Sequence, residues 1–298
     1  MQETDWIKRY IAPLATSDGA DGLRDDVALI TTFGPTIATM DTLVEGVHFL
    51  SNDPLETVGQ KLLRVNVSDV LAKGVEPVEA LLSIAWPSDR PETDFAALIA
   101  GLARDLETFK VSLVGGDLVG TTGPLTLTLT VTGRCIAKGP IRRSGGAPGE
   151  SLFVSGEIGW GGLGLRAARE NGDPKAAQRY RVPEINPVSV AHSVAEGASA
   201  SMDVSDGFLI DAVRLAEASQ CGVEIDLGRI PLAAPSDEME QILSQCTAGD
   251  DYQILLSGPS ELQIPGFSQI GGLTSKMGVQ LRLKGEFVNP PSILGFEH

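Results

Sequence analysis

The sequence predicts an α/β protein of the α+β type with two domains. Apolar runs rich in Val, Ile, Leu and Thr alternate with longer segments in which apolar residues recur at helical spacing. The chain has 298 residues, of which 42% are hydrophobic and 21% charged, and this is enough to bury the cores of about two domains. Near the middle of the chain, the stretch KGPIRRSGGAPGE at 138–150 separates two strand-like runs.

The individual elements follow from these two periodicities and from the turn residues between them. The segments with strand character are residues 27–31, 36–40, 78–85, 111–114, 125–132, 152–155, 200–204, 222–226, 252–256 and 279–283. The segments with helical period are 4–14, 55–73, 93–109, 163–171, 187–196, 208–219 and 236–246. Because the basic, Gly-rich stretch interrupts both patterns, we expect domains at 1–138 and 139–298.

Composition disfavours several classes of protein. With 39 acidic and 23 basic side chains the formal net charge is -16, which argues against a general affinity for nucleic acid or an anionic membrane. The apolar runs are far shorter than the ~18 residues of a spanning helix, and the acidic N-terminus lacks the features of a signal peptide. Three isolated cysteines without metal-binding spacing favour neither disulfides nor a zinc site, so we expect a cytoplasmic protein.

Five short motifs combine an apolar segment with aspartate and a small or hydroxyl residue. They are Arg24-Asp25-Asp26, Thr39-Met40-Asp41-Thr42, Asn66-Val67-Ser68-Asp69, Gly115-Gly116-Asp117 and Asp203-Val204-Ser205-Asp206-Gly207. The first is expected just before a strand, the second and fourth after strands, the third in a helix and the last at a strand-to-helix turn. Carboxylates at strand ends project into the crevice in which α/β proteins bind ligands.

Such a concentration of carboxylates requires cations, because neighbouring carboxylates raise each other's pKa. Oxygen ligands suit Mg²⁺ or Ca²⁺, and Mg²⁺ uses one or two carboxylates together with water and phosphate oxygens. The alternative is structural: aspartate is also a common N-cap and turn residue, so Asp25 and Asp206 could serve as caps alone. The motifs by themselves leave both interpretations open.

Phosphate binding would not use a P-loop, because GxxxxGK[ST] is absent. The segment 159–164 matches GxGxxG, but residues 171–186 show no second parallel strand, which favours a tight turn over a dinucleotide site. At 115–117 the two glycines would let backbone amides approach a phosphate while the aspartate holds a metal. Arg142 and Arg143 offer forked hydrogen bonds to a polyphosphate, or are ordinary surface arginines.

Seven spaced blocks run in order over nearly the whole chain. They are Asp25-Asp26, MDTLVEGVHF at 40–49, NVSDVLAKGVEP at 66–77, VSLVGGD at 111–117, RRSGGAPGE at 142–150, MDVSDG at 202–207 and GDDYQILL at 249–256. Together they resemble the thiamine-monophosphate kinase family, of the superfamily that includes aminoimidazole ribonucleotide synthetase and selenophosphate synthetase. The resemblance implies an N-terminal domain that binds ATP and Mg²⁺ and pairs with its copy in a homodimer, and a C-terminal α/β domain that closes the ATP and substrate cleft.

The resemblance also implies roles for individual residues. The magnesium ligands of the family fall on Asp26, Thr39, Met40, Asp41, Asp69, Asp117, Asp203 and Asp206. The ATP contacts fall on Phe109, Gly116, Asp117, Arg143 and Ser205, and the substrate contacts on His48, Asp250 and Phe296. Met40, Phe109, Asp250 and Phe296 depart from the residue types usual in the family. Met40 can offer a metal only its backbone carbonyl, and Asp250 is one methylene shorter than the usual glutamate.

The activity that the resemblance implies is transfer of the γ-phosphoryl group of ATP to thiamine monophosphate, giving thiamine diphosphate and ADP. Because the acceptor phosphate is already largely ionised at pH 7, a general base is hardly needed, and several Mg²⁺ ions would neutralise the repulsion between the phosphates. One alternative is another ATP-dependent synthetase or dehydratase of the superfamily, disfavoured because residues 1–40 and the C-terminus lack Cys. The other is a nucleotide- or thiamine-phosphate-binding protein with little turnover.

Overall fold

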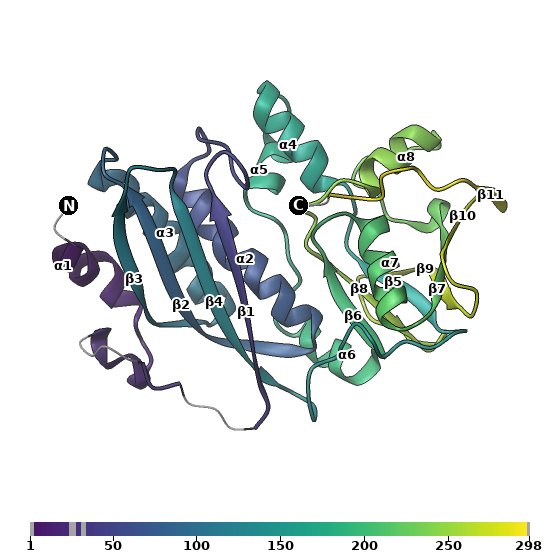
Figure 1. Ribbon diagram of the computed structural model, residues 1–298, viewed down its shortest axis with the longest axis horizontal. Helices are drawn as coiled ribbons and strands as arrows, with labels where there is room; N and C mark the ends of the chain where they lie inside the picture. The colour runs from purple at the N-terminus through teal and green to yellow at the C-terminus, as the bar shows by residue number, and fades with distance from the viewer. Residues whose placement is uncertain (1–2, 24–27, 31–33, 297–298) are drawn as a thin grey trace. The chain divides into compact units, whose positions relative to one another are not determined.

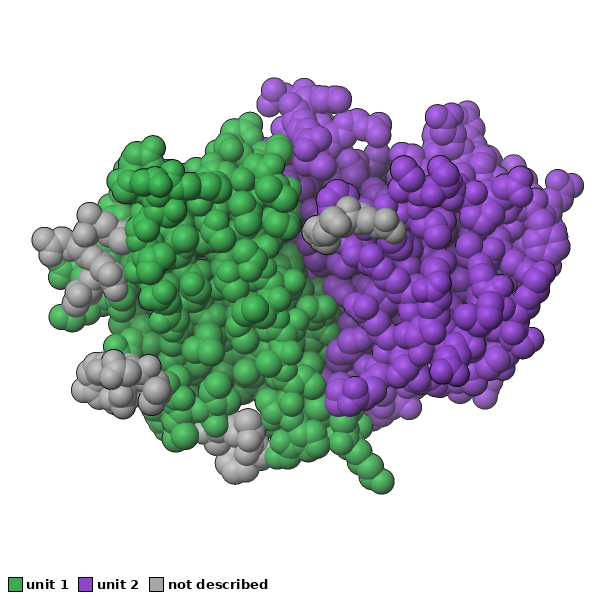
Figure 2. All heavy atoms as spheres, in the orientation of Figure 1, with its two compact units in different colours: residues 1–70, 76–139 green, residues 71–75, 140–298 purple. Residues whose placement is uncertain are grey.

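The computed structural model of the protein describes residues 3–23, 28–30 and 34–296. The chain divides into two compact units: Met1–Val70 together with Glu76–Gly139, and Leu71–Val75 together with Pro140–His298. Figure 2 shows the two units in different colours. Both contain sheets covered by helices, so the predicted mixed α/β class is confirmed.

The first unit is built on a four-stranded sheet with the order β1-β4-β2-β3. Its strands are β1 (Thr36–Val44), β2 (Val75–Pro87), β3 (Ser112–Thr121) and β4 (Thr126–Cys135). β1 and β4 are antiparallel, whereas β2 and β3 are parallel with a bulge between Ala80 and Leu81. Helices α2 (Leu55–Ala72) and α3 (Glu92–Phe109) lie on one face of this sheet (Figure 1).

The core of the first unit lies between the sheet and these two helices. In β4 the side chains of Leu127, Leu129 and Val131 are fully buried, and threonines occupy the alternate positions, because successive strand residues point to opposite faces. The N-terminal segment consists of α1 (Glu3–Trp6), the π-helical turn η1 (Ile7–Ile11) and the 3₁₀ turns η2 (Ala12–Leu14) and η3 (Asp18–Leu23). Trp6 packs against Phe95 of α3, with ring centroids 4.7 Å apart.

The second unit contains a seven-stranded mixed sheet with the order β11-β10-β7-β9-β5-β8-β6. Its strands are β5 (Ser151–Ser155), β6 (Ala200–Val204), β7 (Gly222–Asp226), β8 (Gln253–Gly258), β9 (Phe267–Thr274), β10 (Val279–Leu283) and β11 (Glu286–Val288). Its helices are α4 (Trp160–Glu170), α5 (Pro174–Arg181), α6 (Val190–Gly197), α7 (Phe208–Ala218) and α8 (Met239–Cys246), with a 3₁₀ turn η4 (Leu227–Arg229). Every residue of the central strands β5 and β8 is buried, and so is every residue of β6, although β6 lies at the edge of the sheet.

The core of the second unit is one apolar cluster that includes Val204 of β6, Phe208 and Leu215 of α7, and Leu281 of β10. Residues 71–75, at the end of α2 and the start of β2, join this unit through polar contacts. Lys73 Nζ donates a hydrogen bond to the Ser201 carbonyl at 2.5 Å, and Ser201 Oγ donates to the Ala72 carbonyl. No helix in the described part of the chain is both long and apolar enough to cross a membrane.

Most predicted elements are present, and β6, β7 and β10 have the predicted bounds. The sequence periodicities do not predict α5, β9 or β11. Pro174 argues against a helix at α5 when only the sequence is considered. In the structure it occupies the first helical turn, where proline is tolerated, directly after the capping Asp173. Gly271 and Gly272 lower the strand character of β9. Residues 28–30 are not in a strand, and the rest of the predicted strand 27–31 lies outside the described residues.

The prediction that two aspartate motifs follow strands is wrong. Residues 39–42 lie within β1, and residues 115–117 lie within β3. β1 stays paired with β4 as far as Val44, and β3 stays paired with β2 as far as Thr121. The strands therefore continue beyond their polar and glycine residues, because pairing with a neighbouring strand outweighs the low strand propensity of those residues. Asp69 in α2 and Asp206 between β6 and α7 lie in the predicted contexts.

Candidate active site

The first unit brings Thr39, Asp41 and Asp69 together between β1 and α2. Thr39 Oγ1 donates a hydrogen bond to Asp69 Oδ2 at 2.6 Å, and the Asp41 backbone N–H donates to Asn66 Oδ1 at 3.1 Å. Thr39 and Asp41 share one face of β1 because they are two residues apart, and Asn66 and Asp69 are neighbours on α2 because they are three apart. Asn66 is not among the predicted site residues, although it belongs to the same motif as Asp69; its side chain links β1 to α2.

The electrostatics of this cluster favour a cation. Burial and, secondly, the negative charge of Asp69 raise the pKa of Asp41 to about 6. Two carboxylates and a hydroxyl form an oxygen-only donor set, which fits Mg²⁺. Within the described residues no group of three or more His, Cys, Asp or Glu side chains gathers at one place, so water or phosphate oxygens would complete the coordination of such an ion.

Met40 leaves β1 on the face opposite to Thr39 and Asp41, and its side chain is 65% exposed. It lines a cavity of about 540 Å³ in the first unit together with Gly116 and Asp117 of β3. The other walls come from the sheet and the N-terminal segment, and they include Ile7, Ile11, Ala20, Leu23, Ala28, Ile30, Leu81, Ser83, Thr128 and Thr130. The structure therefore gathers Met40, Gly116 and Asp117 at this cavity, whereas the Thr39–Asp69 cluster faces α2.

Gly116 sets the position of Asp117 because it lets β3 approach β2 closely. A Cβ atom at Gly116 would lie 1.8 Å from the Leu82 carbonyl oxygen, far inside van der Waals contact, and the backbone φ is 158°. Leu82 is the residue paired with Gly116 across the parallel ladder. Only glycine is compatible with this approach at the cavity wall.

His48 lies in the turn after β1 and is half-buried. The Val44 N–H donates to His48 Nδ1 at 3.0 Å, so the neutral imidazole carries its proton on Nε2. Lys61 of α2, only 1% exposed, donates from Nζ to the His48 carbonyl oxygen at 3.0 Å. The turn is thus held from both sides, through the His48 ring and through its carbonyl group.

Phe109, the last residue of α3, is 6% exposed. The guanidinium carbon of Arg64 lies 5.7 Å from the centre of its ring, and Arg64 Nε donates to Asp105 Oδ2 at 2.5 Å. The ring therefore packs against an arginine that is itself held by a buried carboxylate. Its contact with ATP stays a prediction.

In the second unit the Ser205–Asp206 turn between β6 and α7 connects several predicted residues. The Asp250 N–H donates to the Ser205 carbonyl at 2.8 Å, and the Phe296 N–H donates to the Asp206 carbonyl at 2.8 Å. Asp203, 5% exposed, lies two residues before the turn on β6. Residues predicted for metal, ATP and substrate therefore belong to one backbone network.

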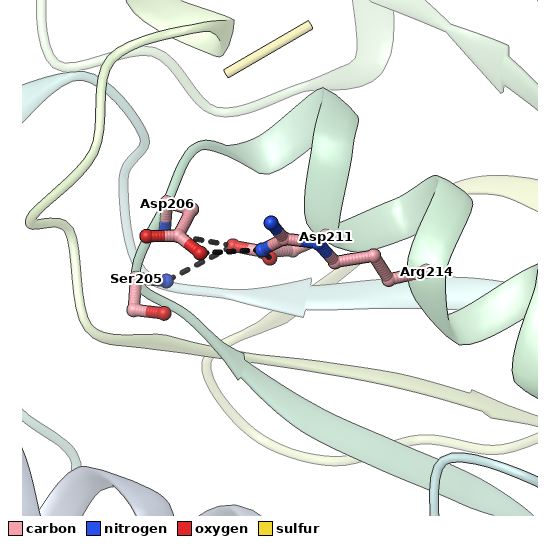
Figure 3. Close-up of polar contacts among 4 residues, drawn as sticks. All are labelled: Ser205, Asp206, Asp211 and Arg214. Carbon is pink, nitrogen blue, oxygen red and sulfur yellow. Dashed lines mark hydrogen bonds and ion pairs between the residues drawn. The ribbon is translucent and has the colours of Figure 1, made fainter. Parts of the chain in front are cut away.

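Asp211 and Arg214 hold this turn from α7 (Figure 3). Asp211 Oδ2 accepts hydrogen bonds from the N–H groups of Ser205 and Asp206, both at 3.0 Å. Arg214 Nη1 donates to Asp211 Oδ1 at 3.0 Å and to Asp206 Oδ2. Burial raises the pKa of Asp211, although the Asp206 N–H and Arg214 act in the opposite direction. Neither residue is among the predicted site residues; their i,i+3 spacing just after Asp206 is the sequence signal that could have identified them.

Asp250 has a positive φ of 67°, and its Oδ1 accepts a hydrogen bond from the Tyr252 hydroxyl at 2.9 Å. The next residue, Asp251, is 4% exposed and accepts from the N–H groups of Gly159 at 2.8 Å and Gly161 at 3.0 Å. Burial raises the pKa of Asp251 to about 7. The GxGxxG segment is accordingly a tight turn at the start of α4, tied to the residue next to Asp250.

Two predicted residues remain. Arg143 is exposed in the segment before β5, and its carbonyl oxygen accepts a hydrogen bond from Ser219 Oγ at 2.7 Å. Asp26 lies outside the described residues.

Two family models match the chain in order. The N-terminal domain of the AIR synthase related proteins matches residues 24–135, and their C-terminal domain matches residues 147–275. A thiamine-monophosphate kinase of Caulobacter vibrioides is 37% identical over 99% of this chain and 90% of its own length. The chain belongs to the thiamine-monophosphate kinase family. The resemblance inferred from the seven sequence blocks is confirmed, and membership of this family makes the protein a phosphotransferase.

Solved structures of thiamine-monophosphate kinases share the fold. The structure from Stenotrophomonas maltophilia has a TM-score of 0.82 and 26% identity, and the match covers 97% of this chain and 98% of that one. The AaThiL complex with AMPPCP and TMP has a TM-score of 0.77 and 31% identity, with 86% of this chain and 85% of that one covered. These matches confirm the two-domain fold that the sequence resemblance implied.

Proposed function

We propose that the protein transfers the γ-phosphoryl group of ATP directly, by in-line displacement, to the phosphate of thiamine monophosphate and releases thiamine diphosphate and ADP. The observation that carries this proposal is the Ser205–Asp206 turn, whose two carbonyl groups hold the N–H groups of Asp250 and Phe296. One turn thus links residues proposed for ATP and metal with residues proposed for substrate. The AaThiL structure, which was solved with AMPPCP and TMP, supports the same pair of ligands.

Mg²⁺ is the ion that fits the donor atoms. The proposed ligands are aspartates, one threonine hydroxyl and one backbone carbonyl, namely Asp26, Thr39, Met40, Asp41, Asp69, Asp117, Asp203 and Asp206. We propose that they share several ions, because Mg²⁺ takes only one or two carboxylates and completes its coordination with water and phosphate oxygens. When bound, such ions neutralise the negative charge that separates the two phosphates.

The remaining proposed residues position the ligands. Phe109, Gly116, Asp117, Arg143 and Ser205 would contact ATP, while His48, Asp250 and Phe296 would contact thiamine monophosphate. His48, whose Nδ1 accepts the Val44 N–H, would contact the phosphate of the substrate. The acceptor phosphate has a second pKa of about 6, so its oxygen is already ionised at neutral pH and the chain need not remove a proton.

We also propose that residues 1–138 bind ATP and Mg²⁺ and form a homodimer, and that residues 139–298 close the ATP and substrate cleft. The second copy would pack on the face of the β1-β4-β2-β3 sheet opposite to α2 and α3. Met40 is 65% exposed on that face, and Val119 of β3 is 45% exposed. Large exposed apolar side chains on an open sheet favour a partner surface.

³¹P NMR tests the reaction. Purified protein with thiamine monophosphate, ATP and Mg²⁺ is expected to produce the paired resonances of thiamine diphosphate together with equal amounts of ADP, and EDTA should suppress both. The alternative, a nucleotide- or thiamine-phosphate-binding protein with little turnover, predicts binding of both ligands without a new diphosphate. That outcome in the presence of Mg²⁺ would rule out the proposed reaction.

A further inference from the structure

All four backbone polar groups of the Ser205–Asp206 dipeptide are engaged by other parts of the second unit. The two N–H groups donate to Asp211 on α7, the Ser205 carbonyl accepts from Asp250, and the Asp206 carbonyl accepts from Phe296. Because this dipeptide is hydrogen-bonded to the segment that contains Asp250 and to the segment that contains Phe296, its orientation determines the positions of both. Asp211 is the side chain that holds it.

Asp211 is suited to this task by its place in the helix. It lies in the first turn of α7 and is fully buried, and the residue before the helix, Gly207, makes no side-chain cap. Its carboxylate therefore reaches back and accepts the amides of the preceding turn, in the way that a capping side chain does. An amide in place of the carboxylate would present an N–H donor where two acceptor oxygens are now used.

Arg214 extends the arrangement to the side chain of Asp206. Its Nη1 group bonds to Asp211 Oδ1 and to Asp206 Oδ2. Figure 3 shows one oxygen of the Asp206 carboxylate directed at Arg214 and the other directed away from it. A carboxylate held at one oxygen keeps a single orientation and can offer the second oxygen to a cation.

We propose that Asp211 and Arg214 are positioning residues for the Ser205–Asp206 turn, Asp211 by fixing its two amides and Arg214 by orienting the Asp206 carboxylate. This inference rests on the proposed function only in assigning Ser205 to ATP and Asp206 to Mg²⁺. Asp211 and Arg214 are not among the residues proposed to contact the ligands. They would act on the ligands through the Asp206 side chain, and through the carbonyl groups of Ser205 and Asp206, which hold Asp250 and Phe296.

Hydrogen exchange in the ligand-free protein tests the positioning directly. In Asp211→Asn the amides of Ser205, Asp206, Asp250 and Phe296 are expected to exchange at least tenfold faster than in the wild type. The matched control is Ser155→Ala, which removes a different buried polar group of the second unit, a hydroxyl that is hydrogen-bonded to the Ile254 N–H and to the side chains of Gln253 and Asn186. The control should leave the four amides unchanged. Equal exchange in Asp211→Asn and wild type would overturn the inference, as would the same acceleration in the control.

Calorimetric titration with Mg²⁺ and AMPPCP separates this inference from the proposed function. Asp211→Asn is expected to weaken binding at least tenfold, and Asp206→Asn at least as much, while Ser155→Ala binds within twofold of the wild type. Weak binding by Asp206→Asn but normal binding by Asp211→Asn would refute the positioning role. Normal binding by Asp206→Asn would instead refute the metal assignment, and the exchange experiment would still decide the role of Asp211.

A second variant covers the case in which Asp211→Asn does not fold. Arg214 is one-third exposed, so Arg214→Lys should fold. A lysine keeps one positive charge near Asp206 but loses the planar guanidinium that bridges two carboxylates. It is expected to weaken binding of Mg²⁺ and AMPPCP at least threefold, and unchanged binding would remove Arg214 from the proposal.

Discussion

Asp251 shows how one buried carboxylate organises a turn next to the proposed substrate residue Asp250. Its two oxygens accept the N–H groups of Gly159 and Gly161 at the start of α4, and its own backbone is continuous with Asp250. Desolvation outweighs these hydrogen bonds and raises the pKa of Asp251 to about 7. The folded protein therefore binds a proton that the unfolded chain has already released above pH 4.

This difference predicts a pH-dependent stability. Between pH 4 and pH 7 the folded state holds more protons than the unfolded state at this site, so the free energy of unfolding falls as the pH rises, by on the order of 4 kcal/mol for this one group. Asp251→Asn cannot titrate there. Urea unfolding at pH 5 and at pH 8 gives the free energy of unfolding of the wild type and of Asp251→Asn at each pH. The wild-type value minus the Asp251→Asn value should fall by about 2 kcal/mol or more from pH 5 to pH 8. A difference that stays constant with pH would contradict it.

At the scale of elements, the pairing of β2 with β3 sets the cavity wall. The two strands are parallel, with a bulge between Ala80 and Leu81, and a Cβ atom added at Gly116 would lie 1.8 Å from the Leu82 carbonyl oxygen. The close approach explains why Gly116 precedes Asp117 in the middle of a strand, where a glycine would otherwise weaken it.

A methyl group at this position should force the two strands apart. We expect Gly116→Ala to lower the free energy of unfolding by about 1–3 kcal/mol, as overpacking does, and to reduce kcat because Asp117 moves with β3. Gly120→Ala, on the same strand but with no atom within 4 Å of its added Cβ, is the matched control. Urea unfolding and steady-state kinetics measure both effects. If Gly116→Ala and Gly120→Ala had the same stability and the same kcat, the close approach of Gly116 to Leu82 would not be what requires glycine here.

For the whole molecule, the two family models match residues 24–135 and 147–275 in turn, and the structure from Stenotrophomonas maltophilia matches 97% of the chain. The proposed homodimer has a clear test. Light scattering should give twice the mass of one chain, and Ala38→Lys should shift the protein toward the monomer, because it places a charge on the exposed sheet face beside Met40. Ser260→Lys, at an exposed position of the second unit, should remain dimeric. A monomeric wild type, or a dimeric Ala38→Lys, would contradict an interface on this face.

Much of the fold was predictable because its signals are local. Strands such as β6, β7 and β10 are short apolar runs bounded by turn residues, and α2 and α3 have helical period over many residues. The family was also predictable, since seven ordered blocks recur only in related chains. The missed elements have mixed signals: α5 is polar and begins with proline, and β9 contains two adjacent glycines.

The fold class, the family and the residue types proposed for the site can all be predicted from the amino-acid sequence. Which of those residues meet depends on the tertiary structure. Strand register places Asp41 and Met40 on opposite faces of β1, and it extends β1 and β3 through motifs expected at strand ends. The roles of Asn66, Asp211 and Asp251 depend on contacts between separate elements and on burial, which shift pKa values and supply hydrogen-bond partners. Such contacts depend on distances that a linear pattern does not contain.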